Sequence, residues 1–350
     1  MSAPANGSIW NTGTLDVWDW NTTNSTKNHS IDKLAATSSS DSHETDTIVF
    51  LVSSISLAVV IVVGNVLIVL AYRSNSRLQT KANMFLVNLA ISDFLVGIVS
   101  LPCWVIVQLL GLQRDDSFYE FFITFDIFSG LTSVLHLTAI SIERFLAISK
   151  PFLYPSISSR YYKVTIAFAW ILAAIISALR SAIPKTWIKF YIPAVLVIGF
   201  LGPLFIIGSM YCGIFKIAKS LILKEPGGDE RMMDRQNRKS SKKVVIRKER
   251  KVAVTVSIIT GLFFVSWLPF YVVLLIGVFC FPGCWPKSPF DVLRVIAFSK
   301  WMHYGNSAVN AFVYSFRDKE MRRTFARLLY NRFTQFCIEV KPVEEASTYL

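Results

Sequence analysis

The stretch that decides the fold runs from Phe118 to Pro151, with the sequence FYEFFITFDIFSGLTSVLHLTAISIERFLAISKP. This long apolar run contains one aspartate, Asp126, and ends near the charged pair Glu143–Arg144. Asp126 and Arg144 are eighteen residues apart, which is about five helical turns, so they share one helix face at a separation of about 27 Å. The hydrocarbon core of a bilayer is roughly 30 Å thick. The stretch therefore predicts a membrane-spanning helix with a carboxylate near one end and a guanidinium at the other.

The composition agrees with a membrane location. Hydrophobic residues make up 53% of the 350 and charged residues 17%, and the mean hydropathy is +0.47, which is high for a soluble domain of this size. The formal charge of +13 comes mostly from short segments between apolar runs. This is the positive-inside pattern, which favours contact with anionic membrane lipid. We expect no nucleic-acid partner.

Seven apolar runs are long enough to cross a bilayer. An odd number of crossings places the two ends of the chain on opposite sides. The basic connections are expected to be cytoplasmic, so the N-terminus is expected outside a plasma membrane. The predicted fold is an all-α membrane protein, a seven-helix bundle whose runs cover 47–72, 83–110, 118–149, 162–183, 187–221, 251–280 and 290–316.

The chain divides around this bundle, which occupies residues 47–316. Residues 1–46 are polar and predicted to be disordered, and four clustered sequons favour a glycosylated extracellular end, although chance in an Asn-rich stretch is an alternative. Residues 317–330 have apolar residues at helical spacing among basic residues, which predicts an amphipathic helix on the inner leaflet. The sequons begin at Asn6, Asn21, Asn24 and Asn28.

The predicted cytoplasmic tail, residues 331–350, carries two short signals. Cys337 is a candidate for palmitoylation, and a free cysteine is the alternative. The last three residues, Thr348–Leu350, fit strand addition to a PDZ domain. Both patterns are short.

Asp93 lies in the middle of the second run, where an ionisable side chain is costly and marks a functional site. Ser133, Asn306 and Asn310 lie at comparable depth, as do Asn65 and Ser307. Oxygen ligands of this kind suit a sodium ion. The alternative is an interhelical hydrogen-bond network without an ion.

Asp126 is expected to need a cation from outside the protein. No basic residue is evident near it, either in its own helix or in the outer halves of the expected neighbours, so Tyr304 and a ligand cation are its expected partners. A protonated structural aspartate is the alternative. An aromatic cage suited to an ammonium group is predicted from Trp267, Phe270, Tyr271 and Trp301.

At the other end, Arg144 has two candidate carboxylates. Glu143 is adjacent, and Glu249 lies near the start of the sixth run. A bridge between helices that opens when they separate would act as a two-state switch, whereas a permanent surface ion pair is the alternative.

These residues resemble those of the rhodopsin-like, class A G-protein-coupled receptors over about residues 47–330. The matching motifs are Gly64-Asn65-Val66, Asn88-Leu-Ala-Ile-Ser-Asp93, Glu143-Arg144-Phe145, Trp170, Pro203 with Tyr211, Phe263, Ser266-Trp267-Leu268-Pro269 and Asn310-Ala311-Phe-Val-Tyr314. The resemblance implies a heterotrimeric G protein as partner, contacted by Arg144 and Tyr211, with arrestin and a receptor kinase as further partners. It also implies that Asn310 and Tyr314 belong to the activation switch.

Within that family the chain is similar to biogenic-amine receptors. Asp126 stands where those receptors keep the carboxylate that pairs with the amine, and Trp301-Met-His303-Tyr304-Gly-Asn306-Ser307 resembles their WxGYxNS run. The resemblance implies a small amine ligand held by Asp126, with Tyr304 orienting the carboxylate. His303 replaces a glycine and adds a titratable donor.

Two departures from the family keep another ligand in view. No cysteine lies near Tyr119 or in the short segment between Ile183 and Phe190, so the family's usual disulfide cannot form and the pocket should be open. Melanocortin-like receptors share such a short loop, which makes a short peptide or another small ligand the alternative. Cys280 and Cys284 are expected to form a small disulfide ring outside the cell.

Other functional classes fit less well. The four histidines form no metal-spaced pair, and no nucleophile–base arrangement is visible, so an enzyme is not expected. A retinal-based light sensor is not expected either, because Tyr304 stands where such a protein carries its Schiff-base lysine.

Overall fold

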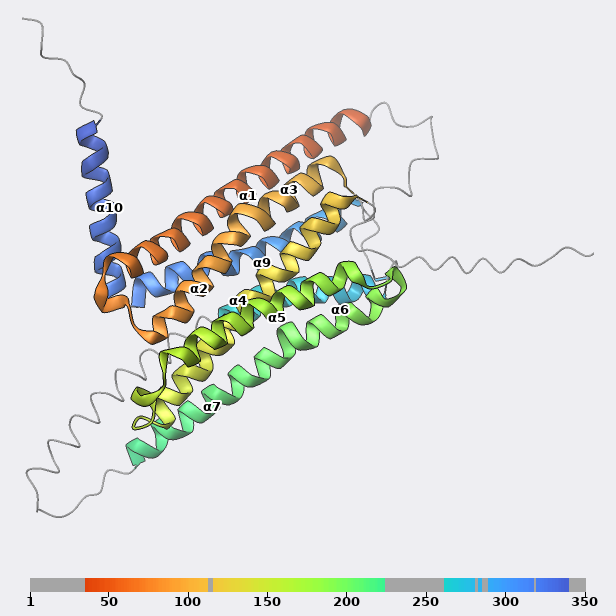
Figure 1. The fold of residues 1–350 in the computed structure, drawn as a ribbon. Coiled ribbons are helices and arrows are strands. Elements are labelled where there is room, and N and C mark those ends of the chain that lie inside the picture. Colours follow the sequence, from red (N-terminus) through yellow and green to blue (C-terminus); the bar gives the residue numbers. More distant parts are fainter. Residues whose placement is uncertain are drawn as a thin grey trace, which may run out of the picture.

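The computed structural model describes residues 35–112, 116–223, 261–280, 283–284, 289–317 and 319–339. Within these residues every regular element is helical, and the long helices lie together as one bundle (Figure 1). A lipid environment explains this, because a spanning segment without water must satisfy its backbone groups internally. We call the end of the bundle near Arg144 the inner end and the opposite end, near Cys280, the outer end.

Most helix bounds lie within a few residues of the predicted runs, whereas the start of the sixth run, residues 251–260, lies outside the described residues. Six described segments are long and apolar enough to cross a membrane; α9 is not one of them, and its outer half carries Asp291, Arg294 and Lys300. The elements are α1 (Ala35–Ser74), α2 (Lys81–Leu95) with η3 (Val96–Ser100) and α3 (Leu101–Leu110), α4 (Ser117–Ser149), α5 (Ser159–Ala182), α6 (Ile188–Leu196) with η6 (Val197–Leu201) and α7 (Gly202–Leu223), the helix Gly261–Phe279, and α9 (Pro289–Arg317).

α1 begins earlier than predicted. Residues 35–46 are helical, whereas their polar composition predicted disorder. These residues contain neither glycine nor proline, so nothing breaks a helix that the apolar part of α1 has already nucleated. The four sequons lie outside the described residues.

Two prolines inside spanning segments coincide with π-helical turns. η3 directly precedes α3, which has Pro102 in its first turn, and η6 directly precedes α7, which contains Pro203. Proline lacks an N–H group, and a wider turn re-pairs the carbonyls that it leaves without a donor.

α4 occupies the centre of the bundle. It packs against α2, α5 and α7, and both Asp126 and Arg144 on it are buried. The helix is unbroken over 33 residues, as predicted from its sequence. Its central position means that any group on its face meets side chains from several other helices.

The apolar face of α10 (Lys319–Glu339) packs against the inner end of the bundle. Met321 and Phe325 are buried in the main hydrophobic core. The helix is turned away from the bundle axis (Figure 1). It is the amphipathic helix predicted over residues 317–330, but it continues nine residues further.

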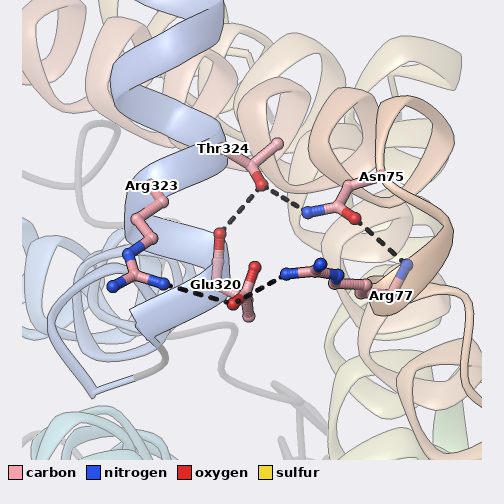
Figure 2. A network of polar contacts seen from close by, with 5 residues as sticks. All are labelled: Asn75, Arg77, Glu320, Arg323 and Thr324. Carbon is pink, nitrogen blue, oxygen red and sulfur yellow. Dashed lines mark hydrogen bonds and ion pairs between the residues drawn. The ribbon is translucent and has the colours of Figure 1, made fainter.

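A polar network fixes the same helix to the turn after α1 (Figure 2). Asn75 Nδ2 donates to Thr324 Oγ1 at 2.9 Å, and Asn75 Oδ1 accepts from the Arg77 amide at 3.0 Å. Glu320 pairs with Arg77 at 3.6 Å and with Arg323 at 3.5 Å. The Arg77 and Arg323 side chains are mostly exposed, so these ion pairs orient the helix more than they stabilise it.

Candidate ligand-binding site

A cavity of about 100 Å³ lies between α4, α5, α6, α9 and the helix Gly261–Phe279. Of the residues predicted to bind a ligand, five line it: Asp126, Trp267, Phe270, Tyr271 and His303. Trp301 and Tyr304 do not. The remaining lining residues include Tyr119, Ile123, Arg180, Tyr191 and Lys300.

The main correction to the sequence analysis concerns the partner of Asp126. Lys300 Nζ lies 2.5 Å from Asp126 Oδ2, and the two side chains are 1% and 7% exposed. The expectation that no basic residue approaches this carboxylate is therefore wrong. Lys300 is one turn before Tyr304 and shares its helix face, which is the signal in the sequence that could have revealed it.

Aromatic rings surround the protein's own ammonium group, and of the four predicted cage residues Phe270 is the one that contacts it. Lys300 Nζ lies 4.6 Å from the ring centre of Phe270, 5.3 Å from that of Phe122 and 5.2 Å from that of Tyr304. Such distances are favourable for cation–π attraction.

The other two residues predicted to bind the ligand, Trp301 and Tyr304, lie away from the cavity. Trp301 faces α1, where its Nε1 donates to Ser54 Oγ at 3.1 Å and its ring lies near Phe50. Tyr304 is fully buried, with its hydroxyl 3.5 Å from Lys300 Nζ. Tyr304 therefore contacts the cation that pairs with Asp126 and lies behind the cavity wall.

Trp267 forms the floor of the cavity, packed between α4 and α9. Its ring lies 4.1 Å from that of His303. A Cβ on Gly130 of α4 would come within 2.7 Å of the Trp267 ring, so glycine is required for this approach. His303 is also stacked on Phe270 at 4.9 Å. The aromatic floor is therefore continuous from α4 to α9.

Arg180 is a second buried cation that the sequence analysis did not identify. It lies at the outer end of α5, is 6% exposed and lines the cavity. Its Nη1 lies 3.3 Å from Glu120 Oε2 on α4. The outer end of a spanning run is a common place for a snorkelling arginine, so its position in the sequence does not indicate that this one turns inward.

The predicted sodium-site residues come together around Asp93. Its Oδ1 accepts from Ser133 and Ser307, both at 2.9 Å, and its Oδ2 accepts from Asn310 at 2.7 Å. The side-chain oxygens of Asn306 and Asn310 are buried and have no hydrogen-bond partner among the described residues. A carboxylate, hydroxyls and two available amide oxygens fit a hard cation such as Na⁺.

At the inner end, Arg144 and Glu143 form the predicted pair. Arg144 Nε donates to one oxygen of Glu143, and the Tyr154 hydroxyl donates to the other. Burial and the Glu143 carboxylate raise the pKa of Tyr154, which therefore remains a donor. Glu143 and Arg144 are both buried, so the pair is not the surface bridge of the alternative interpretation.

The structure describes the remaining predicted site residues only in part. Tyr211 is partly buried against the main core. Glu249 lies outside the described residues, so its bridge to Arg144 stays a prediction. The structure describes the backbone at Tyr314 and Cys337 but not their side chains. Cys280 and Cys284 are joined by a disulfide, with their Cα atoms 5.5 Å apart.

Comparison with known proteins identifies the family. The family model "7 transmembrane receptor (rhodopsin family)" matches residues 64–184 and 180–314. The chain belongs to this family. The receptor is thus a multi-pass protein of the plasma membrane and not an enzyme.

The receptor's relatives include receptors for amines. It is 28% identical over 318 residues to a D(5)-like dopamine receptor of Takifugu rubripes, an alignment that covers 78% of this chain and 65% of the relative. It is 29% identical to a D(1)-like dopamine receptor of Oreochromis mossambicus, with coverages of 78% and 76%. It is also 29% identical to an alpha-1D adrenergic receptor of Rattus norvegicus, with coverages of 80% and 56%. The predicted resemblance to biogenic-amine receptors is confirmed.

Proposed function

We propose that the receptor binds a small ligand with an ammonium group at Asp126 and, in response, activates a heterotrimeric G protein. The observation that carries this proposal is the position of Asp126. Its carboxylate lines the cavity, it is 6% exposed, and its Oδ1 has no hydrogen-bond partner among the described residues. A buried acceptor without a donor is costly, and an ammonium group from a ligand supplies one.

Lys300 sets the conditions for such a ligand. It occupies Oδ2, so a ligand ammonium either binds Oδ1 beside it or displaces it. In both cases the ligand changes the contact that joins α4 to α9. A ligand shifts a conformational equilibrium only by its difference in affinity for the two states. A changed Asp126–Lys300 contact is a direct source of such a difference.

At the inner end, the pair of Glu143 and Arg144 is the element that a G protein must open. Arg144 is 9% exposed and held by Glu143, which also accepts from Tyr154. We propose that separation of the inner helix ends exposes Arg144 and Tyr211. Glu249→Ala is expected to raise ligand-independent signalling if Glu249 completes this lock; an unchanged basal level in a cyclic-AMP or calcium assay would argue against that role.

The test of the ligand site is Asp126→Asn, which keeps the shape of the side chain and removes its charge. We expect the potency of amine agonists to fall at least about 30-fold at equal surface expression, because truncating one partner of a buried charge pair costs about 2–5 kcal/mol. Asp291→Asn is the control, since this side chain is 57% exposed at the outer end of α9. A full amine response in Asp126→Asn receptors would refute the proposal.

A short peptide or another small ligand is the second candidate, favoured by one observation. α5 ends at Ala182 and α6 begins at Ile188, with only the short turn η5 (Lys185–Trp187) between them. A connection this short covers little of the outer end of the bundle. A screen of amines, nucleosides and short peptides with a promiscuous G protein separates the two candidates, because a peptide agonist whose response survives Asp126→Asn supports the second.

We propose further that Na⁺ binds beside Asp93 and favours the inactive arrangement. The supporting observations are the hydroxyls of Ser133 and Ser307 and the amide oxygens of Asn306 and Asn310. Interactions with arrestin, a receptor kinase and a PDZ domain stay predictions. The residues of the PDZ signal, Thr348–Leu350, lie outside the described residues. The N-terminus is proposed to be extracellular.

A further inference from the structure

The cavity carries charges of both signs, and this constrains the chemical class of its ligand. Asp126, Lys300 and Arg180 all line it. Asp126 pairs with Lys300 at 2.5 Å, and Arg180 pairs with Glu120 at 3.3 Å. The four side chains therefore form two ion pairs whose formal charges cancel.

A ligand with a single positive charge would disturb this balance. Asp126 and both cations are at least nine-tenths buried, and charge interactions are several times stronger in such surroundings than in water. A lone ammonium group would gain from Asp126 while being repelled by Lys300 next to it. A ligand that carries a negative group as well would leave the site neutral.

Arg180 has donors to offer such a negative group. A guanidinium has five N–H donors in a planar fork and binds carboxylates in a bidentate manner. The contact of Arg180 with Glu120 is through Nη1, and Glu120 itself is 30% exposed in its side chain. One carboxylate engages at most two of the five donors, so a second carboxylate from the cavity side can be accommodated.

The two poles of the cavity lie within the reach of one small molecule. Tyr119 and Asp126 both line it and are seven residues apart on α4, which is about 10 Å along the helix. The hydrogen bond between Thr124 and Ser181, at 2.9 Å, places the end of α5 that bears Arg180 at this same level. The cavity volume is about 100 Å³, which suits a small ligand.

We propose that the ligand is a small zwitterion of the amino-acid class, with its ammonium group on Asp126 and its carboxylate on Arg180, close to Lys300. This inference rests on the proposed function, because it uses the same carboxylate for the ammonium group. It adds a second anchor that a simple amine cannot use.

The test compares amino acids with the amines formally obtained by removing their carboxyl groups. Tyrosine with tyramine, histidine with histamine, and γ-aminobutyrate with propylamine are suitable pairs, applied to the full-length receptor in cells with a promiscuous G protein. For the pair that fits the cavity, we expect the amino acid to be about 10- to 100-fold more potent, the range of a charge-assisted hydrogen bond. Thermal shift of the purified receptor provides a direct binding measurement.

A double variant, Glu120→Gln with Arg180→Gln, removes the second anchor without leaving a lone buried charge. Its potency ratio between amino acid and amine is expected to fall to within about threefold, since both compounds then rely on Asp126. The matched control is Asp46→Asn with Arg294→Gln, which removes an exposed ion pair of 2.8 Å away from the cavity. The control should keep the original ratio.

The outcomes separate the inference from the proposed function. If every amine is as potent as its amino acid in the parent receptor, the zwitterion proposal is overturned while the amine site stands. A preference that persists in the Glu120/Arg180 variant also overturns it. If no compound that contains an ammonium group acts through Asp126, the proposed function and this inference fail together. The parent receptor alone decides the first outcome, so the proposal stays testable if the double variant does not reach the surface.

Discussion

Replacing Lys300 by methionine should destabilise the receptor more than its single contact suggests. The Lys300 side chain is 1% exposed, and its Nζ is 2.5 Å from Asp126 Oδ2. At an effective dielectric of about 20 the Coulomb attraction at that distance is about 7 kcal/mol, part of which is offset by desolvation of both groups. Removing one partner leaves a buried carboxylate without its cation, which typically costs about 3–5 kcal/mol.

The measurement is the apparent melting temperature of the purified receptor in nanodiscs. Lys300→Met should lower it by at least about 5 °C. The double variant Asp126→Asn with Lys300→Met should return to within about 1 kcal/mol of the parent, because no unpaired charge then remains. Arg294→Met is the control, since this side chain is 61% exposed and its pair with Asp46 contributes little.

Two results would refute this reasoning. If Lys300→Met melts at the same temperature as the parent, the pair does not stabilise the bundle. If the double variant loses as much as the two single variants added together, the two residues are not energetically coupled.

Three further predictions follow from the packing and the polar networks. Gly130→Ala should lower the free energy of unfolding by about 1–3 kcal/mol, because its Cβ would lie 2.7 Å from the Trp267 ring. Gly208→Ala is the control and should not lower it, because nothing lies within 4 Å of the new Cβ. Equal stability of both variants would contradict the packing argument. Asp93→Ala should lower the stability of the receptor by about 1–3 kcal/mol, because Ser133, Ser307 and Asn310 lose their shared acceptor. The same variant should also abolish any difference in agonist affinity between NaCl and choline chloride. A sodium effect that survives would place the ion elsewhere. Glu320→Gln should change the melting temperature by less than Asn75→Ala does. The exposed ion pairs of Glu320 contribute under about 1 kcal/mol, whereas Asn75 caps a turn and holds Thr324. The reverse order would show that the ion pairs dominate this contact.

The fold follows from the sequence, because a bilayer leaves a spanning chain little conformational freedom. Apolar runs of the required length, basic connections on one side and the spacing from Asp126 to Arg144 predicted the bundle and its central helix. Local composition also predicted the amphipathic helix, although its end at Glu339 and the start of α1 at Ala35 were missed. Helix ends beyond the membrane depend on weak propensities, which a hydropathy pattern does not resolve.

Which groups face one another in the cavity depends on how the helices pack, and the sequence does not reveal this. Lys300 and Arg180 are ordinary basic residues in the sequence, and their orientation depends on how α9 and α5 are rotated against α4. Trp301 was misplaced for the same reason, since adjacent residues on a helix point about 100° apart. The sequence thus identified Asp126 as the important carboxylate, whereas the structure showed that it already has a cation of its own and that any ligand must be accommodated beside it.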